Sequence, residues 1–444
     1  MALYGGETYD RAEVDSLWRV TARPGAAFPA LDDDIQAEVA IIGGGFTGLS
    51  AALHLARDHG IQAVVLESGP IGWGASGRNG GFCVPGGDKL GLEAMAHRYG
   101  EAEAKQFLAL TLTAVERVAG LLRDEAIAAE PQPGGELTVA HSQGAFAAQI
   151  KEREAVIALT GHERELLSAE DLCERGLSAG FHGGLRERVG FGLHPLNYVR
   201  GLAEAAARRG ARIFAGGGVT GWSREGGAHR LQTAAGSVRA AKVIVATGGY
   251  PPEALNRGIA GRVLPVLSNI IVTRPLTPDE LAAQGWTSTQ AVCDSRALLH
   301  YFRLLPDRRF LFGGRGGLGG DTAAAGAFRR RLTAEFRKTF PAWREAEITH
   351  FWRGLVDLSA DLTPHCGALE DEPSVLMGCA YHGSGVSMGT ETGAQLARLA
   401  AGLDTPALPG FMRRPPPRFP LPGLRKLYLA GALAGYGLQD RFSG

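Results

Sequence analysis

The chain of 444 residues is long enough for two or three domains and a large buried core. Its 46 Lys and Arg residues balance 46 Asp and Glu residues, so nothing indicates nucleic acid or an anionic membrane surface as a partner. Hydrophobic residues make up 45% and charged residues 21%, which is ordinary for a soluble globular protein.

Five cysteines are scattered along the chain, and no two of them form a C-x-x-C pair. This pattern is typical of reduced thiols rather than of a disulfide framework or a zinc site. The polar stretch 1–10 lacks an apolar signal core, and the apolar run 427–438 is too short and too rich in glycine to span a bilayer. We therefore expect a cytoplasmic protein with no metal site and no stable membrane insertion.

Four apolar residues, 39–42, predict a buried strand of a parallel sheet after an irregular N-terminal extension over 1–35. The spacing G-x-G-x-x-G follows, and a helical pattern comes after it. Gly43 permits a tight turn, Gly45 lets the backbone approach a pyrophosphate, and Gly48 lets helix and strand pack closely. The start of the helix would present free N–H groups to the phosphates.

A second strand over 63–67 ends in an acid, Glu67, which follows the first glycine by 24 residues. That spacing is close to the one at which a carboxylate binds both hydroxyls of a ribose. The unit therefore predicts a dinucleotide site; the alternative is an ordinary βαβ unit with a glycine-rich turn. A further glycine-rich stretch, 69–81, is interpreted as a loop against a flat ligand, or else as a flexible surface loop.

The next part of the chain alternates between helical and strand patterns. Helices are predicted over 92–125 and 149–159, with a strand at 136–141 between them. Glycine-punctuated segments at 181–184 and 189–192 suggest a hairpin or edge strands.

The helix-to-strand rhythm returns in the middle of the chain. Pro195 opens a predicted helix over 196–209, and a strand follows at 211–215. A small meander leads into a buried strand with a glycine turn over 242–250, and strand-like runs continue through 263–316.

The last third begins with a basic amphipathic helix over 324–340, which we interpret as a solvated face. A strand at 375–378 and a glycine-rich segment lead into a helix over 386–401. The proline-rich residues 413–417 predict that the tail is an extended connector.

These motifs together resemble the FAD-dependent amine and amino-acid oxidoreductases of the D-amino-acid oxidase, glycine oxidase and sarcosine oxidase type. The bacterial γ-glutamylputrescine oxidoreductase branch is especially similar, with an early Trp18 segment and a proline-rich tail. The segments that carry the resemblance are 42–52 with Leu66 and Glu67, 74–81, 245–248, Trp352 with Gly354, Thr363 with Pro364, and 382–386.

The resemblance implies an α/β fold with a discontinuous Rossmann-like FAD-binding domain and a mostly antiparallel α+β substrate-binding domain. Residues 1–35 would form an N-terminal extension and 405–444 a C-terminal tail. The implied FAD-binding segments are 36–90, 195–250 and 355–404, and the implied substrate-binding segments are 91–194 and 251–354.

The resemblance also implies where FAD binds. The first glycine loop would hold the pyrophosphate, Glu67 the adenosine ribose, and the backbone of Val219 the adenine. Residues 383–386 would meet the pyrimidine end, where the start of a helix would stabilise the negative charge of reduced flavin. The implied FAD-binding residues are Gly43, Gly45, Phe46, Thr47, Gly48, Glu67, Ser68, Gly74, Ala75, Ser76, Arg78, Asn79, Gly80, Val219, Thr247, Gly248, Gly383, Ser384, Gly385 and Val386.

Two departures from the family pattern bear on the chemistry. The cysteine that tethers flavin in sarcosine oxidases has no counterpart here, since Cys366 lies past the matching region, and we expect non-covalent FAD. Carboxylate-handling relatives often carry a lysine where this chain has Ser387. An amino-acid carboxylate would then need another partner, such as Arg303 or Arg78, and the departure favours an amine substrate. A lysine near flavin N5 assists oxygen in some relatives, and here only Lys89 lies on a flavin-side segment.

Three side chains are the candidate catalytic residues. His382 lies beside the flavin loop and would make a polar contact with the substrate; the alternative is a loop histidine bonded to the backbone. Tyr301 and Arg303 lie two apart on a predicted strand and therefore point the same way, into the pocket or to an outer face. Tyr250 and Trp352 would line an aromatic cage for a cationic amine, or else belong to the core.

The predicted function is FAD-dependent oxidation of the C–N bond of a primary or secondary amine to an imine, with hydride transfer to flavin N5. A γ-glutamylputrescine-like substrate is preferred, as in polyamine catabolism, and O₂ or another acceptor would take the electrons. The alternatives are a D-amino-acid dehydrogenase, a glycine or sarcosine oxidase, and a non-catalytic flavin-binding subunit. A nicotinamide reductase is disfavoured because FAD takes the single fingerprint.

Overall fold

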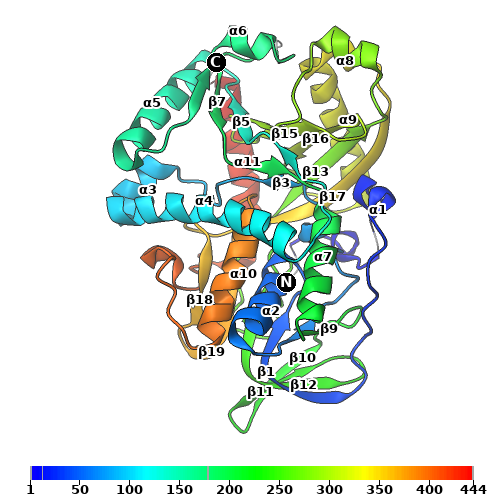
Figure 1. Ribbon diagram of the computed structural model, residues 1–444, viewed down its shortest axis with the longest axis vertical. Coiled ribbons are helices and arrows are strands. Elements are labelled where there is room, and N and C mark those ends of the chain that lie inside the picture. The colour runs from blue at the N-terminus through cyan, green and yellow to red at the C-terminus, as the bar shows by residue number, and fades with distance from the viewer. Residues whose placement is uncertain (1–2, 13, 178–179, 443–444) are drawn as a thin grey trace.

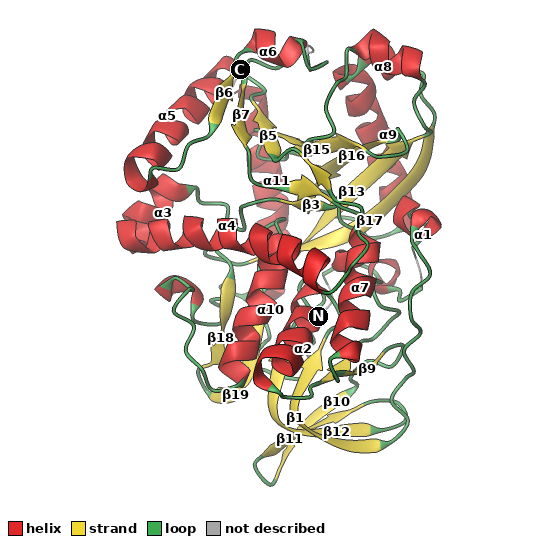
Figure 2. Cartoon of the chain, in the orientation of Figure 1, coloured by secondary structure: helices red, strands yellow, loops and turns green. Residues whose placement is uncertain are grey.

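The computed structural model describes residues 3–12, 14–177 and 180–442. Within these ranges the strands form two eight-stranded sheets and one three-stranded sheet. Figures 1 and 2 show the two large sheets one above the other along the long axis, each with its own helices. The long helix α4 (Glu101–Asp124) crosses between the two halves.

The first sheet, lower in Figure 1, has the order β10-β11-β12-β1-β2-β9, and β19 and β18 extend it beyond β12. Its centre, β19-β12-β1-β2-β9, is parallel, whereas β10, β11 and β18 join it by antiparallel pairs. Residues 39–42 pair with β12 along their length, and residues 40–42 pair with β2 on the other side. This centre is the buried parallel strand that the sequence predicts. The strands are β1 (Asp34–Ile42), β2 (Val64–Leu66), β9 (Arg212–Phe214), β10 (Gly221–Glu225), β11 (Ala228–Gln232), β12 (Ser237–Val245), β18 (His365–Leu369) and β19 (Glu372–Cys379).

Three helices pack together beside the first sheet (Figure 1): α2 (Phe46–His59), α7 (Pro195–Arg208) and α10 (Ser387–Ala400). The helices predicted over 196–209 and 386–401 are confirmed to within one residue at each end, and the helical pattern after the glycine motif is α2. Helix α2 ends at Gly60, whose φ of 68° is left-handed and costs glycine little.

The second sheet has the order β17-β13-β16-β15-β14-β5-β7-β6. Its pairs are antiparallel except for β5 with β14. The predicted combination of a parallel and a mostly antiparallel sheet is confirmed, while the domain boundaries themselves stay a prediction. The strands are β5 (Glu136–Val139), β6 (Glu165–Leu167), β7 (Gly184–Glu187), β13 (Leu264–Thr273), β14 (Ala291–Asp294), β15 (His300–Leu304), β16 (Phe310–Arg315) and β17 (Ile348–Leu358).

The prediction of a hairpin or edge strands at 181–184 and 189–192 is wrong in both forms. Strand β7 lies inside the second sheet, between β5 and β6. The next strand, β8 (Phe191–Gly192), is the centre of a small sheet between β3 (Phe82–Cys83) and β4 (Gln132–Pro133). Both segments pair with strands from other parts of the chain, and local glycine spacing does not reveal such pairing.

The predicted helix over 92–125 is two helices. Helix α3 (Leu92–Tyr99) and α4 meet at Gly100, whose φ of 97° breaks the helical path. The helix predicted over 149–159 begins earlier, as α5 (Gln143–Thr160), because the Ser142 side chain caps it. The remaining helices beside the second sheet are α6 (Ala169–Cys173), α8 (Pro278–Gln284) and α9 (Thr322–Thr339).

The N-terminal extension contains regular structure that the sequence analysis did not predict. Helix α1 (Leu17–Thr21) is capped by the Ser16 side chain, and its Trp18 is buried. The indole of Trp18 donates to the carbonyl of Asn79 over 2.8 Å. Strand β1 begins at Asp34, inside the region expected to be irregular.

The tail is not an extended connector throughout, because its second half forms α11 (Arg425–Phe442). The guanidinium of Arg425 donates to Glu253 at 2.6 and 2.8 Å, and Leu429 joins a buried apolar cluster. Near the end of the helix, the Asp440 carboxylate accepts the backbone N–H groups of Ala297 and Leu298. None of the helices in the described part of the chain is long and apolar enough to cross a membrane.

Candidate active site

A cavity of about 800 Å³ reaches from the carboxyl end of β1 to one face of the second sheet. Its volume is within the range of small-molecule and cofactor sites. All the predicted site residues line it except two, Gly48 and Arg303. The tertiary structure therefore brings together segments that are more than 300 residues apart in the chain.

The glycine loop is shaped by close approaches of the backbone. A Cβ atom on Gly43, whose φ is 110°, would lie 2.5 Å from the carbonyl oxygen of Ala246. A Cβ atom on Gly48 would lie 1.9 Å from the carbonyl oxygen of Gly43. Gly48 thus lies outside the cavity lining because it packs helix against strand, as its place in the motif predicts.

Ser76 joins the second glycine-rich stretch to the start of α2. Its hydroxyl accepts the backbone N–H of Phe46 over 3.0 Å. A Cβ atom on Gly45 would lie 2.8 Å from this hydroxyl oxygen, so the loop fits closely over the helix start. The segment 74–80 is therefore a fixed wall of the cavity rather than a flexible surface loop.

The carboxylate of Glu67 is held by the backbone around it. It accepts the N–H of Gly44 over 2.6 Å, that of Gly69 over 3.1 Å, and the hydroxyl of Ser68 over 3.2 Å. Burial raises the pKa of Glu67, and these donors oppose the rise. A carboxylate has about four acceptor positions, and these three donors leave about one of them free to accept a hydroxyl group from a ligand in the cavity.

Three buried polar atoms of cavity-lining residues have no hydrogen-bond partner among the described residues: Arg78 Nη2, Tyr250 Oη and His382 Nδ1. An unsatisfied buried polar group costs about 1–3 kcal/mol. The cavity is therefore suited to a ligand that carries polar groups along its length.

Of the two residues predicted to form an aromatic cage, one lines the cavity and the other does not. Tyr250 lines the cavity and packs against Trp73, with ring centroids 4.8 Å apart. Trp352 is buried outside the cavity lining, and its indole donates to the carbonyl of Arg78 over 2.7 Å. Trp352 thus belongs to the core and supports the wall that Arg78 forms.

His382 has a left-handed backbone, with a φ of 50°, and its ring is buried. The hydroxyl of Ser359 donates to the carbonyl of Thr363 over 2.7 Å, so its oxygen is left to accept from His382 Nε2 at 3.2 Å. That arrangement places the single ring proton of His382 on Nε2 and leaves Nδ1 as an acceptor. Burial lowers the pKa of His382 to about 3, so the ring is neutral at physiological pH.

Tyr301 lines the cavity, and its hydroxyl lies 2.9 Å from Ser268 Oγ. Its ring passes so close to Gly313 that a Cβ atom there would lie 2.1 Å from it. Burial raises the pKa of Tyr301 to about 12, so the phenol stays protonated.

The expectation that Arg303 points into the pocket is wrong. Its guanidinium is covered by the small sheet and donates to the carbonyls of Gly80 and Leu193 and to the side chain of Gln132, over 3.0, 2.6 and 2.6 Å. Arg303 shares a sheet face with Tyr301, but β3, β8 and β4 lie over it. It is therefore not available to bind a substrate carboxylate.

Among the charged or nucleophilic lining residues that no sequence motif revealed are Glu136, Cys293 and Arg315. Each lies on a strand of the second sheet, and nothing in its local motif marks it. Alternation along each strand shows which of its residues share a face. Only the pairing of strands β5, β14, β15 and β16 in one sheet shows that these three side chains lie on the same face of that sheet.

Residues 38–399 match the family model of FAD dependent oxidoreductases. This chain belongs to that family. It is 32% identical to γ-glutamylputrescine oxidoreductase of Escherichia coli (strain K12), across 96% of this chain and 98% of that protein. It is 24% identical to glycine oxidase of Bacillus licheniformis, across 82% and 92% of the two chains. The predicted resemblance is confirmed.

Solved structures confirm the fold of this FAD-dependent oxidoreductase. Glycine oxidase from Geobacillus kaustophilus matches with a TM-score of 0.68 and 19% identity, over 84% of this chain and 96% of that one. L-Amino acid deaminase from Proteus myxofaciens matches with a TM-score of 0.70 and 16% identity, over 88% and 96%.

The cavity fits the cofactor that the family uses. Its glycine loop leaves room for a pyrophosphate at the start of α2, and Glu67 has acceptor capacity at the end of β2. Unpartnered donors at Arg78 and Tyr250 add polar contacts along the wall. The enzyme is therefore FAD-dependent by family and has residues suited to hold that group.

Proposed function

We propose that this oxidoreductase oxidises the C–N bond of a primary or secondary amine of the γ-glutamylputrescine type to an imine, which water then hydrolyses. The observation that carries the proposal is the 32% identity to a γ-glutamylputrescine oxidoreductase over nearly the whole of both chains. Ser387 supports it. This residue is fully buried, its hydroxyl donates to the carbonyl of Val84 over 2.7 Å, and it supplies no cation to the cavity.

FAD, when bound, would supply the hydride acceptor for the oxidation. We assign its pyrophosphate to the loop 43–48, its ribose to Glu67, and its ring system to the walls 74–80 and 383–386. We also propose that it is held without a covalent bond. Cys366 supports this, because it lies in β18 outside the cavity lining, with its sulfur 3.9 Å from the carbonyl oxygen of Thr392.

His382 and Tyr301 are our candidates for contact with the reacting amine. The neutral ring of His382 offers an acceptor at Nδ1, and the protonated phenol of Tyr301 offers a hydroxyl. A pKa near 3 makes His382 a weak proton acceptor, so its role would be to orient the amine by a hydrogen bond.

We further propose a role in polyamine catabolism in the cytoplasm. All five cysteines are free thiols, which is typical of a reducing compartment. The relative's printed name supplies the link to putrescine. The electron acceptor, O₂ or another compound, is to be found by following reoxidation of the reduced enzyme.

The test is anaerobic mixing of the purified enzyme with a panel of amines, amino acids, NADH and NADPH, followed by the visible absorbance of the flavin. We expect amines, and acylated diamines above all, to bleach the flavin. Reduction by D-amino acids or glycine alone would place the enzyme with the amino-acid oxidases. No reduction by any compound would leave a flavin-binding protein without turnover and overturn the proposal.

A further inference from the structure

One face of the second sheet turns a row of polar side chains toward the cavity. Cys293 lies opposite Tyr301 in the β14–β15 pair, and Tyr301 lies opposite Gly313 in the β15–β16 pair. Arg315 is two residues beyond Gly313 and therefore on the same face. Glu136 shares that face because its neighbour at i+2, Thr138, is paired with Cys293.

Arg315 is a cation without a counter-ion. Its guanidinium donates to the carbonyl of His382 over 2.8 Å, and among the described residues no carboxylate lies within 4.0 Å of it. A Cβ atom on Gly383 would lie 2.0 Å from Nη2, so glycine at that position is what lets the guanidinium reach the loop. Burial lowers the pKa of Arg315, which shows the cost of holding this charge there.

Lys89 is a second cation at the same end of the cavity. Its side chain is exposed and lines the cavity, and no carboxylate of the described residues pairs with it. The neighbouring Asp88 also lines the cavity, and its carboxylate accepts the N–H groups of Leu90 and Gly91. The charge of Arg315, followed by desolvation, lowers the pKa of Lys89 to about 7. The two cations therefore repel each other and lack an anion between them.

Glu136 is the opposite case, an acid without a cation. It accepts from the thiol of Cys293 over 3.6 Å, and no basic group in the described part of the chain lies within 4.0 Å. Burial raises its pKa to about 7. Two other acids of this sheet are paired with arginines, Glu165 with Arg186 at 3.3 Å and Asp294 with Arg296. An unpaired acid in a cavity wall is suited to a ligand cation.

We propose that Arg315 and Lys89 bind the carboxylate, and Glu136 the ammonium, of one zwitterionic head group at the end of the substrate remote from the reacting amine. This proposal rests on the proposed amine oxidation. Strands β5 and β16 are separated by β14 and β15, so the two charges stand three strand spacings apart, about 14 Å between backbones. Glu136 and Arg315 both line the cavity, so the space in front of the sheet face between them is open to a ligand.

The substrate class that follows is a diamine acylated at one end by an α-amino acid. Its free amine would lie near the ring of His382, and Tyr301, which stands between the strands of Arg315 and Glu136, would lie along the chain of the substrate. The α-amino and α-carboxyl groups would lie on the sheet face. This places recognition of the carboxylate away from the carbon that is oxidised, and it explains how Ser387 can be neutral in an enzyme whose substrate still carries a carboxylate.

The test compares putrescine derivatives that differ only in head-group charge: N-acetyl (none), N-glutaryl (carboxylate only), N-(4-aminobutanoyl) (ammonium only) and N-(γ-glutamyl) (both). Anaerobic stopped-flow measurement of flavin reduction gives an apparent Kd for each. We expect the γ-glutamyl compound to bind at least about tenfold more tightly than either singly charged compound. Equal affinities across the series, within about threefold, would overturn the proposal.

Variants assign each charge to its partner. Arg315→Met and Lys89→Met should each weaken the glutaryl and γ-glutamyl compounds about tenfold and leave the 4-aminobutanoyl compound unchanged. Glu136→Gln should weaken the 4-aminobutanoyl and γ-glutamyl compounds about tenfold and leave the glutaryl compound unchanged. The matched controls are Arg309→Met and Glu165→Gln, which remove ion-paired charges of the same half of the protein outside the cavity lining. An equal loss for all four compounds in Arg315→Met would contradict the assignment.

Calorimetry with γ-glutamylpropylamide, which has no terminal amine, separates the two proposals. If this probe binds the wild-type holoenzyme and not Arg315→Met, the head-group site stands even where no amine reduces the flavin. If amines reduce the flavin and the probe does not bind, the oxidase proposal stands and the head-group site falls. Should Arg315→Met not retain flavin, Lys89→Met and the wild-type series decide.

Discussion

At Gly48 the backbone of Gly43 and the side chain of Ile41 leave no room for a side chain. A Cβ atom there would lie 1.9 Å from the carbonyl oxygen of Gly43 and 3.2 Å from Ile41. Helix α2 would have to move away from β1 to make room, and the loop that we assign to the pyrophosphate would move with it.

We expect Gly48→Ala to destabilise the protein by about 3 kcal/mol or more and to lower its flavin content. Thermal unfolding and the flavin-to-protein absorbance ratio measure the two effects. Gly431→Ala is the matched control, because a Cβ atom there meets nothing within 4 Å. Equal effects of the two substitutions would show that close packing at Gly48 is not the cause.

His382 is the second residue whose proposed role depends on a single atom, the acceptor Nδ1. We expect His382→Leu, which removes the Nδ1 acceptor, to slow flavin reduction by about 10²-fold with substrate saturating. His382→Gln should recover part of the rate, because its amide oxygen can accept a hydrogen bond. The same flavin content and Tm in both variants would separate this effect from misfolding; equal rates in Leu and Gln would refute an acceptor role.

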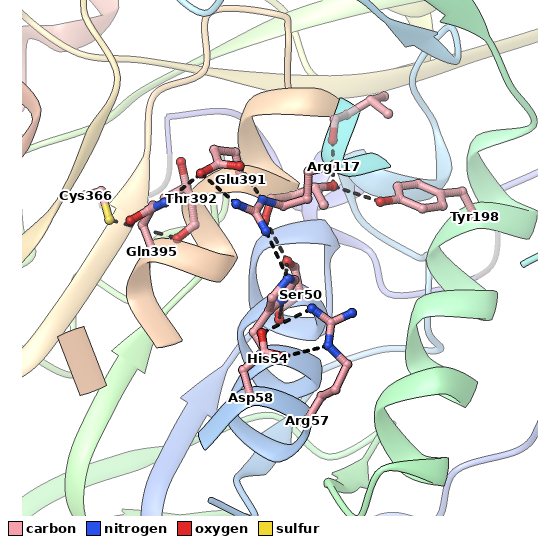
Figure 3. Close-up of polar contacts among 12 residues, drawn as sticks. Ser50, His54, Arg57, Asp58, Arg117, Tyr198, Cys366, Glu391, Thr392 and Gln395 are labelled. Atoms are coloured by element: carbon pink, nitrogen blue, oxygen red, sulfur yellow. Dashed lines mark hydrogen bonds and ion pairs between the residues drawn. The ribbon is translucent and has the colours of Figure 1, made fainter. Parts of the chain in front are cut away.

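At the scale of elements, α2, α4 and α10 are joined by a buried polar cluster (Figure 3). The guanidinium of Arg117, on α4, pairs with the carboxylate of Glu391 on α10 and lies 3.4 Å from His54 Nε2 on α2. Glu391 also accepts from Gln395 over 2.7 Å. The helix that crosses the molecule is thereby tied to the two helices beside the glycine loop.

We expect Arg117→Leu to cost about 3–5 kcal/mol, because it leaves the 1% exposed carboxylate of Glu391 without its cation. The double variant Arg117→Leu/Glu391→Leu should recover much of that loss, since no charge is then left buried. Denaturant unfolding of both variants gives the comparison. A double variant no more stable than the single one would contradict the explanation.

Element prediction from sequence succeeded where the contacts were local. The unit from β1 to β2 lies within 33 residues, 34–66, so the spacing of its glycines and apolar residues is enough to predict it. Helix α11 was missed because its sequence is rich in glycine, a poor helix former. Its buried ion pair to Glu253 and its contact through Leu429 come from distant parts of the chain and stabilise it.

At the scale of the whole molecule, three buried histidines make stability depend on pH. Burial lowers the pKa of His54 and His194 to about 4 and that of His382 to about 3. In the unfolded chain each would titrate near 6.5. Below that pH the unfolded state binds more protons than the folded state, so stability is complete above pH 6.5 and falls as the pH drops toward 4.

Each histidine should cost about 2 kcal/mol at pH 5, or about 6 kcal/mol for the three together. The raised pKa of Glu136 acts in the opposite direction over this interval and offsets about 2 kcal/mol of that loss, so we expect a net fall in Tm between pH 7 and pH 5. Replacing His54 by Gln should remove the contribution of that ring and flatten the profile. A Tm that is constant over this interval would show that these rings titrate normally in the folded state.

The sequence by itself determined the cofactor half of this protein. The turn at Gly43, the close packing at Gly48 and the acid at Glu67 are local demands of a strand-turn-helix-strand unit, and local spacing expresses them directly. Only the tertiary structure decided the substrate half. Arg303 and Arg315 are both arginines on strands of one sheet, yet β3, β8 and β4 cover the first while the second faces the cavity. Which strands pair, and what lies over them, depends on contacts between residues far apart in the chain, and local periodicity carries no record of those contacts.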